Sequence, residues 1–201
     1  DLDIAVWATL DSWASGGNQA LAGKWLSTGN QLSYQLRVNS TGNVLILIST
    51  TGLGGGAVVT WTSSVALNLS AGTQRWARGT LDVNNGAGGS TAKFYTSTDG
   101  ATWTQLGADV TGAVAAPFAG SAALELGSES AGTTSLVAGR IHRAIVRSGI
   151  GGTTVADFDA GLCGQSGYTD AQGNVWTVNR STTGRKTVVQ SPAARSARSV
   201  I

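Results

Sequence analysis

Residues 76–86 read WARGTLDVNNG, and this stretch decides the fold. Small or apolar side chains alternate along residues 76–83 with Trp76 and with polar side chains, which is the two-residue period of a β-strand with one buried face. The Asn-Gly pair that follows is typical of a tight hairpin turn, because both residues tolerate positive φ. The stretch therefore predicts a strand that runs into a hairpin.

The same period recurs along the chain between Gly, Asn and Ser residues, and no segment carries a convincing amphipathic helix. A second turn of this kind is predicted at Thr98-Asp99-Gly100. We predict strands at residues 1–10, 20–27, 32–39, 44–50, 58–69, 76–83, 91–97, 102–106, 122–127, 140–147, 154–159 and 174–178. Because each strand has one buried face, a second sheet is needed to cover the first. The expected fold is all-β, a two-sheet antiparallel sandwich.

Composition sets the class of protein without naming its chemistry. The chain has 201 residues, of which 41% are hydrophobic and 12% charged. This apolar fraction excludes a disordered chain, and the length suits one sandwich domain. No stretch approaches the roughly 18 uninterrupted apolar residues of a membrane helix. The single cysteine, Cys163, cannot form an internal disulfide. Cysteine usage therefore does not indicate whether the protein resides in a reducing or an oxidising compartment.

Positive charge is concentrated at the C-terminus. The segment 180–201 contains no acidic residue and holds Arg180, Arg185, Lys186, Arg195 and Arg198. The remaining eight basic and eleven acidic residues give segment 1–179 a net charge of −3. We therefore divide the chain into a domain at 1–179 and an extended basic tail at 180–201. The tail is interpreted either as a solvated linker or as a segment that docks the domain onto a partner.

Several strings of residues occur in an order that resembles one family. They are DLDI at 1–4, GKW at 23–25, WARGTLDVNNGAGG at 76–89, FYTSTDGATWTQLG at 94–107, AGRIHRAIVRSGI at 138–150, VADFD at 155–159 and WTVN at 176–179. Over residues 1–178 the chain resembles the concanavalin A-like, laminin-G-like jelly-roll domains of actinobacteriophage minor tail proteins. The resemblance implies a jelly roll, a location in the virion and other virion proteins as partners in a symmetric assembly. A further strand precedes the position of Asp1 in such proteins, so we expect the native chain to begin earlier.

Enzymatic readings find little support in the sequence. Glu125 and Glu129 are the only glutamates, and along an extended strand they would lie roughly 13 Å apart, too far for a nucleophile and acid pair. Asp157 and Asp159 would lie about 7 Å apart on one strand face, but no third acid accompanies them. His142 is the only histidine, which excludes a two-histidine metal site within one chain. We expect no enzyme activity.

Aromatic residues suggest a binding face instead. Seven of the residues are Trp, and the alternation places Trp7 and Trp76 on the polar faces of their strands. Stacking rings beside a few polar groups are typical of carbohydrate sites. We predict a shallow glycan-binding face built from Trp7, Arg37, Trp76 and Arg78. The alternative is that one or both tryptophans pack under a loop or against a neighbouring subunit.

We expect no cofactor. Calcium is known in laminin-G-like folds, and Asp99, Asp109 and Asp170 stand in loop contexts, but no dense acidic run offers the 6–8 oxygen ligands that calcium takes. The expected protein is a non-enzymatic virion structural or adhesion protein, a minor tail protein that contacts host-surface glycan or other particle proteins. Membrane insertion and nucleic-acid binding are not expected. A capsid decoration protein and a secreted bacterial lectin-like module remain open as alternatives.

Overall fold

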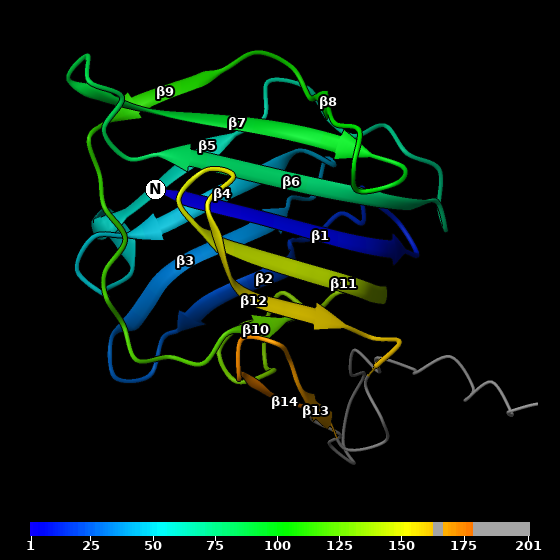
Figure 1. Ribbon diagram of the computed structural model, residues 1–201. Helices are drawn as coiled ribbons and strands as arrows, with labels where there is room; N and C mark the ends of the chain where they lie inside the picture. The colour runs from blue at the N-terminus through cyan, green and yellow to red at the C-terminus, as the bar shows by residue number, and fades with distance from the viewer. Residues whose placement is uncertain (163–166, 179–201) are drawn as a thin grey trace, which may run out of the picture.

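A computed structural model describes residues 1–162 and 167–178 of the chain (Figure 1). The predicted basic tail, with Arg180, Arg185, Lys186, Arg195 and Arg198, lies outside the described residues, as does Cys163. No helix in the described part is long and apolar enough to cross a membrane. The described residues form strands and one short 3-10 helix, η1 (Gly55–Ala57).

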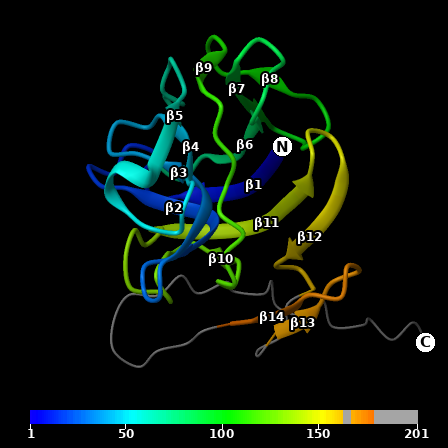
Figure 2. The same cartoon turned by 90° about the vertical axis from the view of Figure 1, so that its left-hand side faces the viewer.

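Two antiparallel sheets pack face to face, which confirms the predicted all-β sandwich with jelly-roll architecture (Figures 1 and 2). The seven-stranded sheet has the order β12-β11-β1-β6-β7-β8, and β9 also pairs with β7. Its strands are β1 (Leu2–Leu10), β6 (Gln74–Asp82), β7 (Gly89–Ser97), β8 (Thr104–Gln105), β9 (Val110–Ala113), β11 (Gly139–Ser148) and β12 (Thr153–Asp159). The five-stranded sheet, in the order β10-β2-β3-β4-β5, consists of β2 (Gln19–Leu26), β3 (Gln31–Val38), β4 (Val44–Ser49), β5 (Val58–Thr62) and β10 (Glu125–Leu126).

The core lies between the two sheets and is built by the alternation that the sequence shows. Ile4 on β1, Leu36 on β3, Ile46 on β4 and Phe94 on β7 are each 0% exposed and belong to one apolar cluster. Burying such a side chain contributes roughly 1.5–3 kcal/mol, so the inward faces of the strands hold the sandwich together. Their outward faces remain for other tasks.

Gly79 allows the sheets to approach closely at β6. A Cβ on Gly79 would lie 2.8 Å from Cδ1 of Ile46 and 2.9 Å from Cδ1 of Leu36, both on the five-stranded sheet. Any larger side chain would therefore force the facing residues to move. The glycine in the stretch WARGTLDV is a packing requirement.

A small hairpin of β13 (Gly167–Thr169) and β14 (Val175–Thr177) lies next to β12, the last strand of the seven-stranded sheet (Figure 1). Its Tyr168 and Trp176 rings lie 6.1 and 5.2 Å from the ring of Phe158 on β12. The main chain of β12 also bonds to hairpin side chains. The amide of Asp157 donates to Asp170, Tyr168 Oη donates to the Asp157 carbonyl, and Asn174 Nδ2 donates to the Val155 carbonyl. The hairpin thus caps an open sheet edge.

Several strand predictions differ from the structure in their ends. The strand predicted at 58–69 stops at Thr62, because the side chain of the next residue, Ser63, accepts a hydrogen bond from the amide of Val44. Further along, Asn68 adopts a positive φ of 49°, which a strand does not allow. The strands predicted at 102–106 and 122–127 shrink to β8 and β10, and β9 and β13 were not predicted. The turn predicted at 84–86 is a longer loop, in which Asn85 Oδ1 accepts from the amides of Ala87 and Gly89.

Candidate functional site

Trp7 and Trp76 lie directly opposite each other on neighbouring strands, on the outer face of the seven-stranded sheet. Their ring centroids are 5.9 Å apart and their planes differ by 8°. The outward direction of both side chains, predicted from the alternation, is therefore confirmed. Cross-strand aromatic pairs of this kind stabilise a sheet in addition to any role in binding.

Trp76 is not an exposed platform, and this corrects the prediction. The side chain is only 6% exposed because the turn between β7 and β8 covers it. A Cβ on Gly100 would lie 2.8 Å from Cε2 of Trp76, and the edge of the Trp103 ring packs against Trp76 at 6.1 Å. Asp99 fixes this turn by accepting hydrogen bonds from Thr102, Ala101 and Ser97, which lower its pKa to about 2. Trp76 therefore packs under a loop, the alternative stated above.

Arg78 is committed to the fold. Its Nε and Nη2 donate to the two carboxylate oxygens of Asp3 at 2.8 and 2.7 Å. Asp3 is 0% exposed, and a buried carboxylate requires such a partner. The guanidinium also lies 5.3 Å from the ring centroids of Tyr95 and of Trp103. Arg78 thus holds the outer face of the sheet together.

Arg37 belongs to the other sheet and cannot share a face with Trp7. It lies on β3, where its Nη2 donates to Glu129 at 2.6 Å and its Nε donates to Gln35. Its neighbours Leu36 and Val38 point into the core, so Arg37 faces away from the seven-stranded sheet. Which sheet each strand joins depends on strand pairing and not on local pattern, so the predicted four-residue face is wrong in Arg37.

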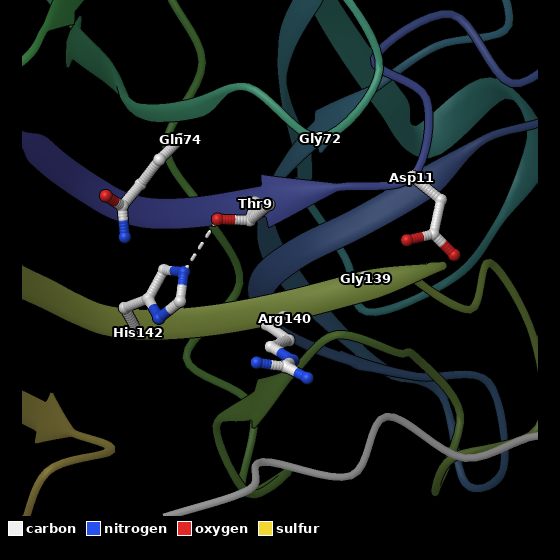
Figure 3. A pocket seen from close by; sticks show the side chains of 7 residues that line it. All are labelled: Thr9, Asp11, Gly72, Gln74, Gly139, Arg140 and His142. Atoms are coloured by element: carbon white, nitrogen blue, oxygen red, sulfur yellow. Dashed lines mark hydrogen bonds between the residues drawn. The ribbon is translucent and has the colours of Figure 1, made fainter. Parts of the chain in front are cut away.

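A hollow of about 620 Å³ opens at the end of β1 (Figure 3). It is lined by Thr9, Asp11, Gly72, Gln74, Gly139, Arg140 and His142. Thr9 on β1 stands opposite Gln74 on β6 and opposite Arg140 on β11, so three adjacent strands supply its floor. None of the four predicted residues lines this hollow. Trp7 comes nearest, because its ring contacts the lining residue His142.

Gly139 makes the floor of the hollow possible. Its φ is +141°, and a Cβ there would lie 2.2 Å from the Thr9 carbonyl oxygen and 2.7 Å from the Cα of Leu10. Only glycine permits β11 to begin so close to the end of β1. This close approach brings Arg140 next to Thr9.

His142 shares the outer face of β11 with Arg140, two residues earlier, and stands at a bulge. The pairing of β1 with β11 shifts between Trp7 and Ala8, which face Arg143 and Ile141, so His142 is the extra residue. Bulges re-aim side chains. The ring lies 4.9 Å from the Trp7 ring, and Nε2 is 2.8 Å from Thr9 Oγ1. Burial, together with the charge of Arg140, lowers the pKa of His142, so the imidazole is neutral at pH 7.

Three polar side chains of the hollow have no bonding partner within the described residues. Asp11, Gln74 and Arg140 are exposed, and their side chains make no hydrogen bond or ion pair within the described part of the chain. Figure 3 draws them around the one bonded pair, Thr9 and His142. Sequence reasoning missed Asp11, Gln74 and Arg140, because no single strand contains more than one of them. The only local signal for this site was that Thr9 shares the polar face of its strand with Trp7.

The carboxylates considered for catalysis have structural partners. Glu125 accepts from the amides of Ala131 and Gly132, and Glu129 accepts from Gln35 and Arg37. Both therefore anchor the loop that follows β10.

The paired aspartates on β12 are likewise bonded. Asp157 receives two bonds from Arg143, at 2.8 and 2.7 Å, and Asp159 accepts from the amide of Gly161. Asp157 thus joins β12 to β11, and Asp159 fixes the turn that follows β12.

The loop aspartates considered for calcium also have separate tasks. Asp99 fixes its own turn, Asp109 pairs with Lys93 at 3.0 Å, and Asp170 holds the β13–β14 hairpin. Within residues 1–162 and 167–178, no three acidic, histidine or cysteine side chains are grouped so that they could hold a metal ion.

Comparison with known proteins yields similar folds alone. No protein-family profile and no curated protein sequence matches the chain. Among solved structures, the CBM40 module of the Ruminococcus gnavus IT-sialidase aligns at 16% identity and a TM-score of 0.48, over 72% of this chain and 74% of that one. The same module bound to α2,3-sialyllactose aligns at a TM-score of 0.44 and 16% identity, over 69% and 70% of the two chains. The receptor-binding domain of botulinum neurotoxin type G aligns at 8% identity and a TM-score of 0.31, over 68% and 31%.

Proposed function

We propose that this chain is a non-enzymatic glycan-binding module that contacts sugar through the hollow beside Trp7. One observation carries the proposal: Asp11, Gln74 and Arg140 line a hollow beside two aromatic rings and have no partner within the described residues. Sugar sites combine an apolar surface that stacks on the ring with a few polar groups that bind hydroxyls. The partly exposed rings of Trp7 and His142 supply the first, and the three side chains supply the second.

The proposal excludes catalysis because the candidate carboxylates already have partners. Glu125 and Glu129 hold a loop, and Asp157 is bound on both oxygens by Arg143. A glycosidase needs one carboxylate free to attack or to act as base, and a second to protonate the leaving group. We accordingly propose binding without turnover.

The setting of the module is proposed from the sequence resemblance alone. The strings at 76–89, 94–107 and 138–150 support the proposal that the chain is a minor tail protein of an actinobacteriophage. The glycan that it binds would then lie on the surface of the host cell. Imaging of purified particles tests this setting. The chain should be found among other virion proteins, and its absence from particles would favour a secreted lectin-like module.

Glycan retention on immobilised oligosaccharides tests the binding itself. Arg140→Ala and Gln74→Ala should each weaken retention, because each removes a free hydrogen-bonding group without disturbing a bond in the fold. Lys93→Ala and Gln105→Ala, on the β7 and β8 side of the sheet, are matched controls and should retain glycan as the parent does. Equal retention by all four variants would contradict the proposed site.

A further inference from the structure

The two charged side chains of the hollow are opposite in sign and unpaired. Arg140 stands opposite Thr9, while the Asp11 amide bonds to the Ala138 carbonyl, so Asp11 and Arg140 are diagonal neighbours across β1 and β11. Diagonal neighbours lie within reach of long side chains. No ion pair joins them, although both belong to the described chain and line the same hollow (Figure 3).

Among residues 1–162 and 167–178, the other arginines on the neighbouring strands of this face each have an acidic partner. Arg78 and Arg147 contact Asp3, and Arg143 is paired with Asp157. His142 is neutral at pH 7, because burial and the charge of Arg140 lower its pKa. The described lining of the hollow therefore offers one carboxylate and one guanidinium, whose charges cancel.

We infer that the hollow selects an uncharged sugar, held with two neighbouring hydroxyls between the Asp11 carboxylate and the Arg140 guanidinium, and rejects sugars that carry a carboxylate. This inference rests on the proposed glycan-binding function and specifies its ligand class. A hydroxyl donates to a carboxylate and accepts from a guanidinium, so a pair of hydroxyls satisfies both side chains at once. Gln74 adds a further donor and acceptor from the third strand.

An acidic sugar satisfies only half of this arrangement. Its carboxylate would gain Arg140 but would lie near the carboxylate of Asp11, and like charges brought together at a partly desolvated site repel. Asp11 is thus the residue that discriminates between neutral and acidic sugars, since specificity follows from repulsion of the wrong ligand as well as attraction of the right one. Removing the Asp11 charge should therefore change which sugars bind, in addition to how tightly they bind.

The test compares the retention of two sets of oligosaccharides by the whole chain. The neutral set is xylo-, manno- and galacto-oligosaccharides, and the acidic set is α2,3-sialyllactose and oligogalacturonate. The parent protein should retain at least one neutral probe about tenfold more strongly than either acidic probe. Asp11→Asn should reduce this ratio about fivefold or more, and Arg140→Gln should weaken both sets.

Matched controls separate a local effect from a change of net charge. Asp109→Asn and Lys93→Gln make the same charge changes at an exposed pair elsewhere on the sheet, and they should leave the ratio unaltered. Because Asp11 and Arg140 are exposed and unbonded in the fold, their variants should unfold at the same denaturant concentration as the parent.

The outcomes distinguish this inference from the function on which it rests. Stronger or equal retention of the acidic probes by the parent overturns the inference and leaves glycan binding intact. The same holds if Asp11→Asn and Asp109→Asn shift the ratio alike. Retention of no probe by the parent overturns the proposed function together with the inference.

Discussion

At the scale of single residues, Gly79 sets the distance between the two sheets. Gly79→Ala places a methyl group 2.8–2.9 Å from side-chain atoms of Ile46 and Leu36. Overpacking of this kind costs about 1–3 kcal/mol, so we expect the free energy of unfolding in urea to fall by that amount. Gly17→Ala is the matched control, because its Cβ would meet nothing within 4 Å, and it should leave stability almost unchanged.

The buried carboxylate of Asp3 should be far more sensitive to substitution than an exposed one. Asp3→Ala leaves the Arg78 guanidinium beneath the outer face without its counter-charge, and breaking such a pair costs about 3–5 kcal/mol. Asp109→Ala breaks an exposed pair with Lys93, which is worth about 0–1 kcal/mol. Urea unfolding of both variants checks the contrast, and equal losses would argue against a structural role for Arg78.

Trp76 and Arg78 show which structural features could be predicted from the sequence. Ala77, Gly79 and Leu81 alternate with Trp76 and Arg78, and since side-chain direction in a strand is a local property, the faces were predicted correctly. That Trp76 is covered by Gly100, and that Arg78 meets Asp3, depends on which strands pair. Pairing joins residues far apart in sequence, and no local pattern encodes it.

At the scale of elements, the β13–β14 hairpin protects the edge of β12. An unpaired edge strand invites pairing with another chain, and here side chains of the hairpin occupy its main-chain groups. Asp170→Ala removes the acceptor for the Asp157 amide and for the Trp176 indole. We expect faster hydrogen exchange at Asp157 and faster self-association. Unchanged exchange there would show that Asp170 does not hold the cap.

The hairpin should also open in acid. Burial opposes ionisation of Asp170, but hydrogen bonds from Asn174, the Asp157 amide and Trp176 outweigh it and lower the pKa to about 2. A carboxyl group with a depressed pKa stabilises the fold above its unfolded value of about 3.9 and loses that contribution as pH falls toward 2. Hydrogen exchange of the Asp157 amide should therefore accelerate between about pH 4 and pH 2 more than global unfolding explains. The Asp170→Asn variant should lack this pH dependence.

The bulge in β11 is the element that sequence reasoning could not place. A regular strand at 140–147 predicts that His142 and Arg143 point to opposite faces, whereas the shift between Trp7 and Ala8 leaves both side chains on the outer face. The hollow exists because of a register that only the partner strand defines.

At the scale of the whole molecule, the central strand β1 joins segments that are far apart in the sequence. Leu2 pairs with Ser148, so β1 takes its place between β6 and β11 only when residues nearly 150 positions apart have come together. Folds dominated by such distant pairings refold over roughly milliseconds to seconds. Stopped-flow tryptophan fluorescence after dilution from urea should show a main phase in that range, and completion within microseconds would contradict it.

The parallel indoles of Trp7 and Trp76 have an optical consequence. Two identical chromophores 5.9 Å apart, with planes 8° from parallel, couple their excited states, and in a chiral protein such coupling splits the circular dichroism band into a pair of opposite sign. The contribution of the Trp7–Trp76 pair to this couplet requires the native register of β1 on β6. Because the Trp7 ring also contacts His142, which lines the hollow, the protein carries an intrinsic, label-free spectroscopic reporter both of correct strand pairing and of occupancy at its own surface.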